Sequence, residues 1–186
     1  MKKVLAAALA SFALFAACKN SGENKAPVVP AEAAQEPQSK VPYYYGLIEE
    51  YQTILAEDPH NLAAVIGLGN AYFDSGAWRE AITQYERALK LDPRNADVLT
   101  DMGTCFRNLG MPERALSEYR KALQFEPGHL NARYNMGVIY AYDLKDYAVA
   151  IHVWQELLRL SPNHPHAEYM RSCIATFKKS LKKAGP

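Results

Sequence analysis

The 186-residue sequence has few of the residues that build catalytic or covalently crosslinked sites. It holds only three cysteines, Cys18, Cys105 and Cys173, with no Cys-x-x-Cys pair and no haem-attachment run. This excludes a disulfide framework and a cysteine-based metal site. The sequence also has no Gly-x-Ser-x-Gly elbow, phosphate-binding loop or Ser-His-Asp set, so it indicates no enzyme class.

An excess of charge of one sign is also missing. Lys and Arg total 21 against 20 Asp and Glu, a net charge of +1. Such a balance gives no long-range field to attract nucleic acid or an anionic substrate. We therefore expect no nucleic-acid partner, no small-molecule substrate and no cofactor. No metal site is expected either, because the histidines lack carboxylate or thiol partners at ligand spacing. They are His60, His129, His152, His164 and His166.

The only long apolar run lies at the N-terminus and is too short to span a bilayer. Met1-Lys2-Lys3 is cationic, and Val4–Ala17 contains 14 apolar or small residues, whereas a membrane span needs about 20. A cationic start followed by a short apolar run is typical of an export signal. A buried core helix is the alternative interpretation of this run.

The run ends in Phe15-Ala16-Ala17-Cys18, which resembles the lipobox of bacterial lipoprotein precursors, with Phe15 where that family usually has Leu. The resemblance implies that residues 1–17 are a lipoprotein signal peptide and that Cys18 is the lipid attachment site, carrying palmitate-type acyl chains. Several acyl chains on one residue anchor a protein stably to a membrane. Ordinary signal-peptidase cleavage is the alternative, although it places bulky Phe15 three positions before the cut.

Residues 18–42 combine the proposed lipidated cysteine with a Pro- and Ala-rich linker that has no helical or strand period. Fully extended, the linker would reach at most about 75 Å, so it would hold the rest of the chain clear of the membrane surface. Lys19 follows the cysteine where inner-membrane lipoproteins of enteric bacteria carry Asp. This resemblance implies a location in the bacterial cell envelope, at the outer membrane and facing the periplasm.

A repeat of about 34 residues organises the remainder of the chain. Pro59, Pro93, Pro127 and Pro162 are separated by 34, 34 and 35 residues, a period typical of helical repeats. Apolar residues recur at helical intervals in two blocks per period, which predicts two antiparallel helices in each. The recurring positions are Leu68, Gly69, Tyr72, Ala81, Tyr85, Ala88 and Pro93, then Met102, Gly103, Phe106, Ala115, Tyr119, Ala122 and Pro127, then Met136, Gly137, Tyr140, Ala150, Trp154, Leu157 and Pro162.

This pattern resembles the tetratricopeptide repeat (TPR) family, which implies an all-α superhelix of stacked helix pairs. The boundaries are an N-terminal capping helix within 43–61, repeats at 62–95, 96–129 and 130–164, and a C-terminal capping helix with a basic tail at 165–186. The lone first helix is expected over Leu47–Glu57, and the extra residue of the third repeat in the turn at Asp143–Asp146.

Several residues have expected local roles. Gly69, Gly103 and Gly137 are expected at close helix crossings, because glycine inside a helix costs about 1 kcal/mol unless it allows close approach. The repeat prolines end the second helices. Asn61, Asn95 and Asn163 are candidate caps of the helices that follow, and Cys105 and Cys173 are expected to be buried thiols.

The family resemblance also implies a binding groove lined by the first helix of each pair. The implied residues are Ile66, Asn70, Phe73, Asp74, Thr100, Asp101, Thr104, Arg107, Asn108, Asn131, Tyr134, Asn135, Val138 and Tyr142. Asn side chains donate to and accept from a peptide backbone, and Phe73, Tyr134 and Tyr142 offer rigid apolar area. The ligand expected here is therefore an extended or helical peptide.

Chaperone-tail receptors of the family use a Lys and Arg clamp for carboxylates. Here Ile66, Asn131 and Asn135 occupy the basic positions, and Asp101 replaces an Asn, which disfavours that function. We expect a non-enzymatic scaffold that binds a protein or peptide, in assembly of an envelope complex. The alternative is a periplasmic chaperone-like helper, such as the TPR modules of cytochrome c maturation.

Overall fold

The structure, a computed structural model, describes residues 41–184. The expected signal peptide, Cys18 and nearly all of the linker lie outside the described residues. Over residues 41–184 the protein is helical and has no strand, which confirms the expected all-α fold. The helices are α1 (Val41–Glu57), α2 (Leu62–Asp74), α3 (Trp78–Leu91), α4 (Ala96–Asn108), α5 (Pro112–Phe125), α6 (Leu130–Val138) with the π-helical turn η2 (Ile139–Asp143), α7 (Tyr147–Leu160) and α8 (Ala167–Ala184).

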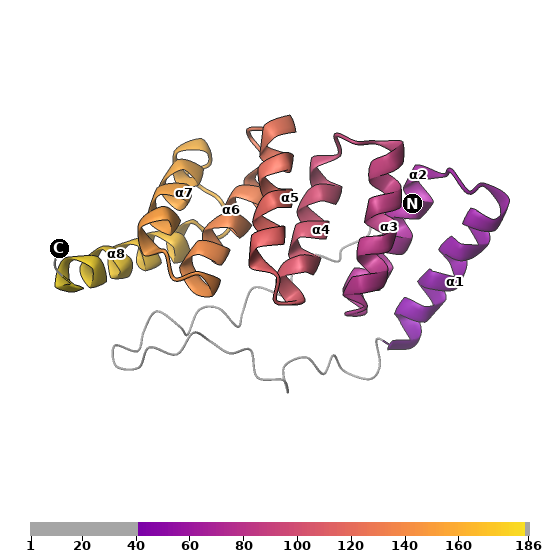
Figure 1. The fold of residues 1–186 in the computed structure, drawn as a ribbon, viewed down its shortest axis with the longest axis horizontal. Coiled ribbons are helices and arrows are strands. Elements are labelled where there is room, and N and C mark those ends of the chain that lie inside the picture. The colour runs from indigo at the N-terminus through magenta and orange to yellow at the C-terminus, as the bar shows by residue number, and fades with distance from the viewer. Residues whose placement is uncertain (1–40, 185–186) are drawn as a thin grey trace.

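The helices form a row of stacked pairs. Helix α2 packs on α3, α4 on α5, and α6 on α7, and each pair also contacts the next. Figure 1 shows this row along the long axis of the molecule, with α1 at one end and α8 at the other. Helix α1 packs against α2, and α8 packs against α7. Helix α1 begins at Val41, earlier than the expected Leu47.

Polar side chains cap the first helix of each pair. The side chains of Asn61 and Asn95 accept from the backbone N–H groups of Ala64 and Val98, each at 3.0 Å. These bonds satisfy donors that the first turn of a helix leaves unpaired. In the third repeat His129 Nδ1 performs this role, accepting from Ala132 N at 3.1 Å. An asparagine is therefore not required at this position.

The expected cap at Asn163 is wrong. Its neighbour His164 occupies the position that corresponds to His129, and His164 Nδ1 accepts from the backbone N–H of His166 at 3.2 Å. Helix α8 then begins at Ala167. The repeat is one residue longer here, and that shift moves the capping position from Asn163 to His164.

The glycines in the first helices allow close contact with aromatic rings of the second helices. A Cβ atom on Gly69 would lie 2.7 Å from Cε1 of Tyr85, and one on Gly103 would lie 2.5 Å from Cε1 of Tyr119. Both rings are buried. The expected close crossing is present, but the space beside Gly69 and Gly103 is filled mainly by the rings of Tyr85 and Tyr119. The alanines four residues before these tyrosines, Ala81 and Ala115, fill less of it.

The extra residue of the third repeat is accommodated in a helix, not in the turn at Asp143–Asp146. It widens the end of α6 into η2, where Leu144 N donates to Ile139 O at 3.0 Å across five residues. In the first two repeats the second residue after this helix is a glycine with positive φ, Gly76 at 79° and Gly110 at 74°. In the third repeat Lys145 takes that conformation, with φ 57°. A non-glycine residue is strained there.

The core runs through the stack and changes character toward the C-terminus. Repeats one and two pack mainly aliphatic residues with Tyr85 and Tyr119. The end of the stack packs Trp154, Tyr169 and Phe177 together with η2 and α8. Cys105 and Cys173 are buried and are not joined in a disulfide, which confirms the expectation of buried thiols.

Candidate peptide-binding groove

The candidate groove is defined here by twelve residues of α2, α4, α6 and η2. The two other residues that the resemblance implied, Ile66 and Val138, are half-buried and buried. Asn70, Asp74, Asn108 and Asn131 are exposed, and Phe73, Asp101, Thr104, Arg107, Tyr134, Asn135 and Tyr142 are partly buried. Thr100 is only 3% exposed, and its Oγ1 donates to Ala96 O at 2.7 Å. It supports the groove and offers almost no contact area, so its expected place in the lining is corrected.

Polar groove residues are held by hydrogen bonds to the second helices. Tyr85 Oη donates to Asn70 Oδ1 at 2.8 Å. At the equivalent position of the next repeat, Tyr119 Oη and Thr104 Oγ1 lie 3.1 Å apart. Asn135 Nδ2 donates to Thr104 Oγ1 at 3.4 Å, which links α6 to α4. These bonds restrict rotamers, so less side-chain entropy is lost when a ligand binds.

The part of the groove nearest α1 is acidic. Burial, chiefly, and the neighbouring carboxylates of Asp97 and Asp74 raise the pKa of Asp101 to about 6, with His129 opposing the shift. His129 Nε2 lies 2.9 Å from Asp97 Oδ1. Because His129 Nδ1 accepts from a backbone N–H, Nε2 carries the hydrogen and donates it to Asp97.

The basic residue of the groove is already paired. Arg107 Nε donates to Asp143 Oδ2 at 2.5 Å, and Arg107 Nη2 donates to Asp143 Oδ1 at 3.3 Å. The two-point contact connects α4 to η2, and both side chains are about a third exposed, at 33% and 28%. Arg107 is therefore engaged with Asp143, and it is not among the groups that shift the pKa of Asp101.

The aromatic residues at the other end pack against the region around α8. Tyr134 stacks on His166 with ring centroids 4.6 Å apart, and it also stacks on Trp154 and His164. Tyr142 Oη is hydrogen-bonded to Tyr169 and lies 3.5 Å from Cys173 Sγ. Part of the surface of both tyrosines is therefore packed against residues of the same chain. The sequence did not reveal this, because the partners lie 20 to 32 residues away.

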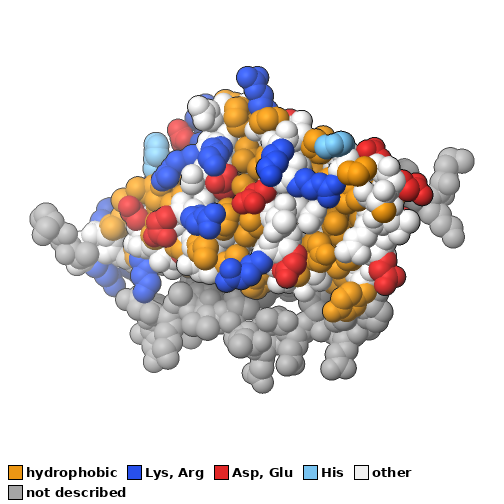
Figure 2. All heavy atoms as spheres, turned by 45° about the vertical axis from the view of Figure 1, so that its right-hand side comes forward, with side chains coloured by type: hydrophobic (Ala, Val, Ile, Leu, Met, Phe, Trp, Pro, Cys, Tyr) orange, Lys and Arg blue, Asp and Glu red, His pale blue; other side chains and the backbone are white. Residues whose placement is uncertain are grey.

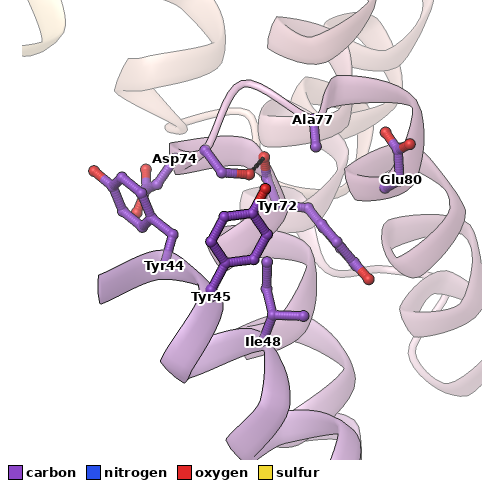
Figure 3. A pocket seen from close by; sticks show the side chains of 8 residues that line it. Tyr44, Tyr45, Ile48, Tyr72, Asp74, Ala77 and Glu80 are labelled. Carbon is purple, nitrogen blue, oxygen red and sulfur yellow. Dashed lines mark hydrogen bonds between the residues drawn. The ribbon is translucent and has the colours of Figure 1, made fainter. Parts of the chain in front are cut away.

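A pocket that the sequence did not predict lies at the α1 end of the stack. Its volume is about 410 Å³, and it is lined by Tyr44, Tyr45, Ile48, Tyr72, Asp74, Ser75, Ala77 and Glu80. Figure 3 shows Tyr44 and Tyr45 projecting from α1 toward the end of α2, with Glu80 on α3. The run Tyr43-Tyr44-Tyr45 was the available signal. Asp74 belongs to both this pocket and the candidate groove.

The surface of the helix row carries charges of both signs. On the face seen in Figure 2, basic and acidic side chains are interspersed with apolar ones. This distribution agrees with the net charge of +1. None of the helices within residues 41–184 is long and apolar enough to cross a membrane.

Comparison with known families agrees with the period and the helix pairs. Models described as "TPR repeat" and "Tetratricopeptide repeat" match residues 69–110, 96–129 and 131–164. The chain is a tetratricopeptide repeat protein. Comparison with proteins of curated function gives no match.

Solved structures share the fold at low sequence identity. A crystal structure of MamA is 22% identical with a TM-score of 0.63, covering 76% of this chain and 88% of that one. A second MamA structure is 21% identical with a TM-score of 0.62, covering 79% and 84%. The first TPR of Spaghetti (RPAP3), bound to the HSP90 peptide SRMEEVD, is 22% identical with a TM-score of 0.59, covering 67% and 96%. These likenesses establish the TPR superhelix.

Proposed function

We propose that this protein is a membrane-anchored, non-enzymatic scaffold that binds a peptide segment of a protein partner in the candidate groove and serves assembly of an envelope complex. The observation that carries the proposal is the fixed set of polar side chains presented by successive first helices. Asn70 and Thr104 are held by buried tyrosines at equivalent positions. Asn108 and Asn131 are exposed nearby in the same set.

The chemistry of this set suits a peptide backbone. Asparagine offers both a donor and an acceptor, and a pre-oriented set of such groups lowers the entropy lost on binding. At the level of the fold, the Spaghetti (RPAP3) structure holds a peptide. Its peptide SRMEEVD is acidic, whereas Asp74 and Asp101 would repel such a tail here. The partner segment of this protein is therefore not expected to be an acidic tail.

Site-specific photo-cross-linking in cells tests the groove. A photoreactive amino acid at Asn131 should cross-link the partner, whereas the same residue at exposed Ser117 on α5 should not. Equal cross-linking from both positions would refute binding by the groove. The identity of the captured protein separates an envelope-assembly component from a transient client of a chaperone-like helper.

The anchor is proposed from the N-terminal sequence, where Phe15-Ala16-Ala17-Cys18 precedes a Pro-rich linker. Acylation of Cys18 would place the groove at the periplasmic side of the outer membrane, within reach of the linker. The Cys18→Ala variant should lose palmitate labelling and move to the soluble fraction. A variant that still labels and sediments with the outer membrane would contradict the anchor and leave the groove proposal intact.

A further inference from the structure

The last helix, α8, is longer than the first helices of the repeats to which it corresponds. It has 18 residues, whereas α2 and α4 have 13 each. Tyr147, the first residue of α7, stacks on Phe177 of α8 with ring centroids 4.6 Å apart. Leu181 continues the buried stripe of Ile174 and Phe177 by one helical turn, yet it is 42% exposed. The end of α8 therefore projects beyond the start of α7, and Figure 1 shows it pointing away from the row of helices.

This projecting end is basic. It carries four exposed lysines within six residues: Lys178, Lys179, Lys182 and Lys183. No Asp or Glu follows Glu168 in the sequence, and no salt bridge among residues 41–184 involves these lysines. At 3.6 residues per turn the four side chains lie on one side of the helix, within an arc of about 140°. Without them the net charge of +1 would be −3, so this side is far more basic than the chain as a whole.

The helix macrodipole explains only part of this charge. It favours cations within the last turn of a helix, and the last turn of α8 holds Lys182 and Lys183. Lys178 and Lys179 lie before that turn. The second helices α3 and α7 have one basic residue each in the last turn, and α5 has none. The additional lysines of α8 therefore indicate an anionic ligand.

We propose that the basic end of α8, defined as Lys178, Lys179, Lys182 and Lys183, binds the anionic headgroups of the membrane to which Cys18 anchors the protein. The inference rests on the proposed function, because acylation of Cys18 would confine the chain within a linker's reach, at most about 75 Å, of the membrane surface. Such confinement makes a second, weak contact effectively intramolecular. Each lysine close to an anionic lipid surface strengthens binding about fivefold. Because α1 and α8 are at opposite ends of the row, this contact would lay the row along the membrane.

Partitioning of the purified, unacylated full-length chain into vesicles tests the contact. The measured quantity is the ratio of two partition coefficients, one for phosphatidylcholine vesicles with about 30% phosphatidylglycerol and one for phosphatidylcholine alone. The apolar run Val4–Ala17 contributes to both coefficients, so the ratio reports on headgroup charge. The triple variant Lys179→Gln, Lys182→Gln and Lys183→Gln should lower the ratio at least tenfold at about 0.1 M salt, since three lysines account for roughly 100-fold before screening.

A matched variant separates the basic end of α8 from net charge. Arg79→Gln, Lys90→Gln and Arg159→Gln together remove the same charge from exposed positions on α3 and α7, and this control should keep a ratio close to that of the parent. Arginine in place of the three lysines should also keep it. Equal falls in the two Gln variants would overturn the proposal. A parent that shows no preference for anionic vesicles would also overturn it and would favour an acidic protein as the ligand. Circular dichroism verifies that each variant is folded.

The vesicle measurement depends neither on acylation nor on the groove. Palmitate labelling of the Cys18→Ala variant tests the anchor in cells, and cross-linking through Asn131 tests the groove. An unchanged vesicle ratio in the α8 triple variant, together with loss of palmitate labelling in Cys18→Ala, would therefore refute the lipid contact of α8 while the anchor stands.

Discussion

Replacing Asp101 by Asn should stabilise the protein at neutral pH and not at acid pH. Burial and the neighbouring carboxylates raise the pKa of Asp101 from 3.8 to about 6. Between these values the folded protein binds more protons than the unfolded chain. The stability linked to this group is thus complete below pH 3.8 and is lost as the pH rises through 6. Asparagine does not ionise, so Asp101→Asn removes this loss of stability.

The size of the effect follows from the shift. About two pH units at about 1.4 kcal/mol each set an upper limit near 3 kcal/mol. Asp101 is only partly buried, and water screens the carboxylate, so we expect a gain of about 1–2 kcal/mol at pH 7.5. The charges that face this group are Asp74, Asp97 and His129. All three remain in the variant.

Urea unfolding followed by circular dichroism measures the gain. At pH 7.5 the midpoint of Asp101→Asn should exceed that of the parent, and at pH 4 the gain should largely vanish. The exposed Glu86→Gln variant on α3 should match the parent at both pH values. Equal midpoints at pH 7.5, or the same gain at both pH values, would refute the linkage argument.

Four other substitutions test the fold. Gly69→Ala should lose about 1–3 kcal/mol of unfolding free energy because its Cβ meets the Tyr85 ring at 2.7 Å. Gly46→Ala, with open space around it, should gain up to about 1 kcal/mol. Stabilisation of both variants, or destabilisation of both, would contradict the close crossing at Gly69. Lys145→Gly should raise the thermal midpoint, because it relieves a positive φ costing about 1 kcal/mol; a lower midpoint would show that the turn is unstrained. Burial, chiefly, and the neighbouring His166 lower the pKa of His164 below 6.5. The stability contributed by His164 should therefore be constant above pH 6.5 and fall below it, opposite in sign to the contribution of Asp101. His164→Asn should flatten that fall in urea titrations, and an unchanged slope would assign it to another group.

The stacked repeats could be predicted from the sequence because their signals are local and recur three times. The helix-ending Pro93, the capping Asn95 and the crossing Gly103 each lie within the segment that they organise. A single substitution at such a position changes one repeat, while the other two still reveal the pattern. The helical spacing of the apolar residues and the spacing of the prolines therefore predict the same architecture.

The features that the sequence did not reveal depend on contacts between segments. The capping role of His129 requires the distance between its ring and α6, and an imidazole is not a common cap. The turn η2 depends on where the extra residue is least costly, and a single insertion can lie at several positions with the same spacing of prolines. The internal packing of Tyr134 and Tyr142 depends on how α8 and the turn before it sit on the third repeat.

In the candidate groove, some features could be predicted from the sequence and others could not. Its polar residues fall on the first helices as the family resemblance implied, but Asn70 and Asn135 are committed to internal hydrogen bonds. Alanine at these two positions would change stability as well as binding. Asn108 and Asn131 are exposed and are the cleaner positions for testing a ligand.

Hydrogen exchange of the complex with the protein captured through Asn131 tests the central claim most directly. If the groove holds the partner, amides of α2, α4 and α6 should exchange more slowly in the complex than in the free protein. Helices α3, α5 and α7 should be unchanged apart from their buried interfaces. Protection confined to α3, α5 and α7 would place the partner on the opposite face and contradict the account.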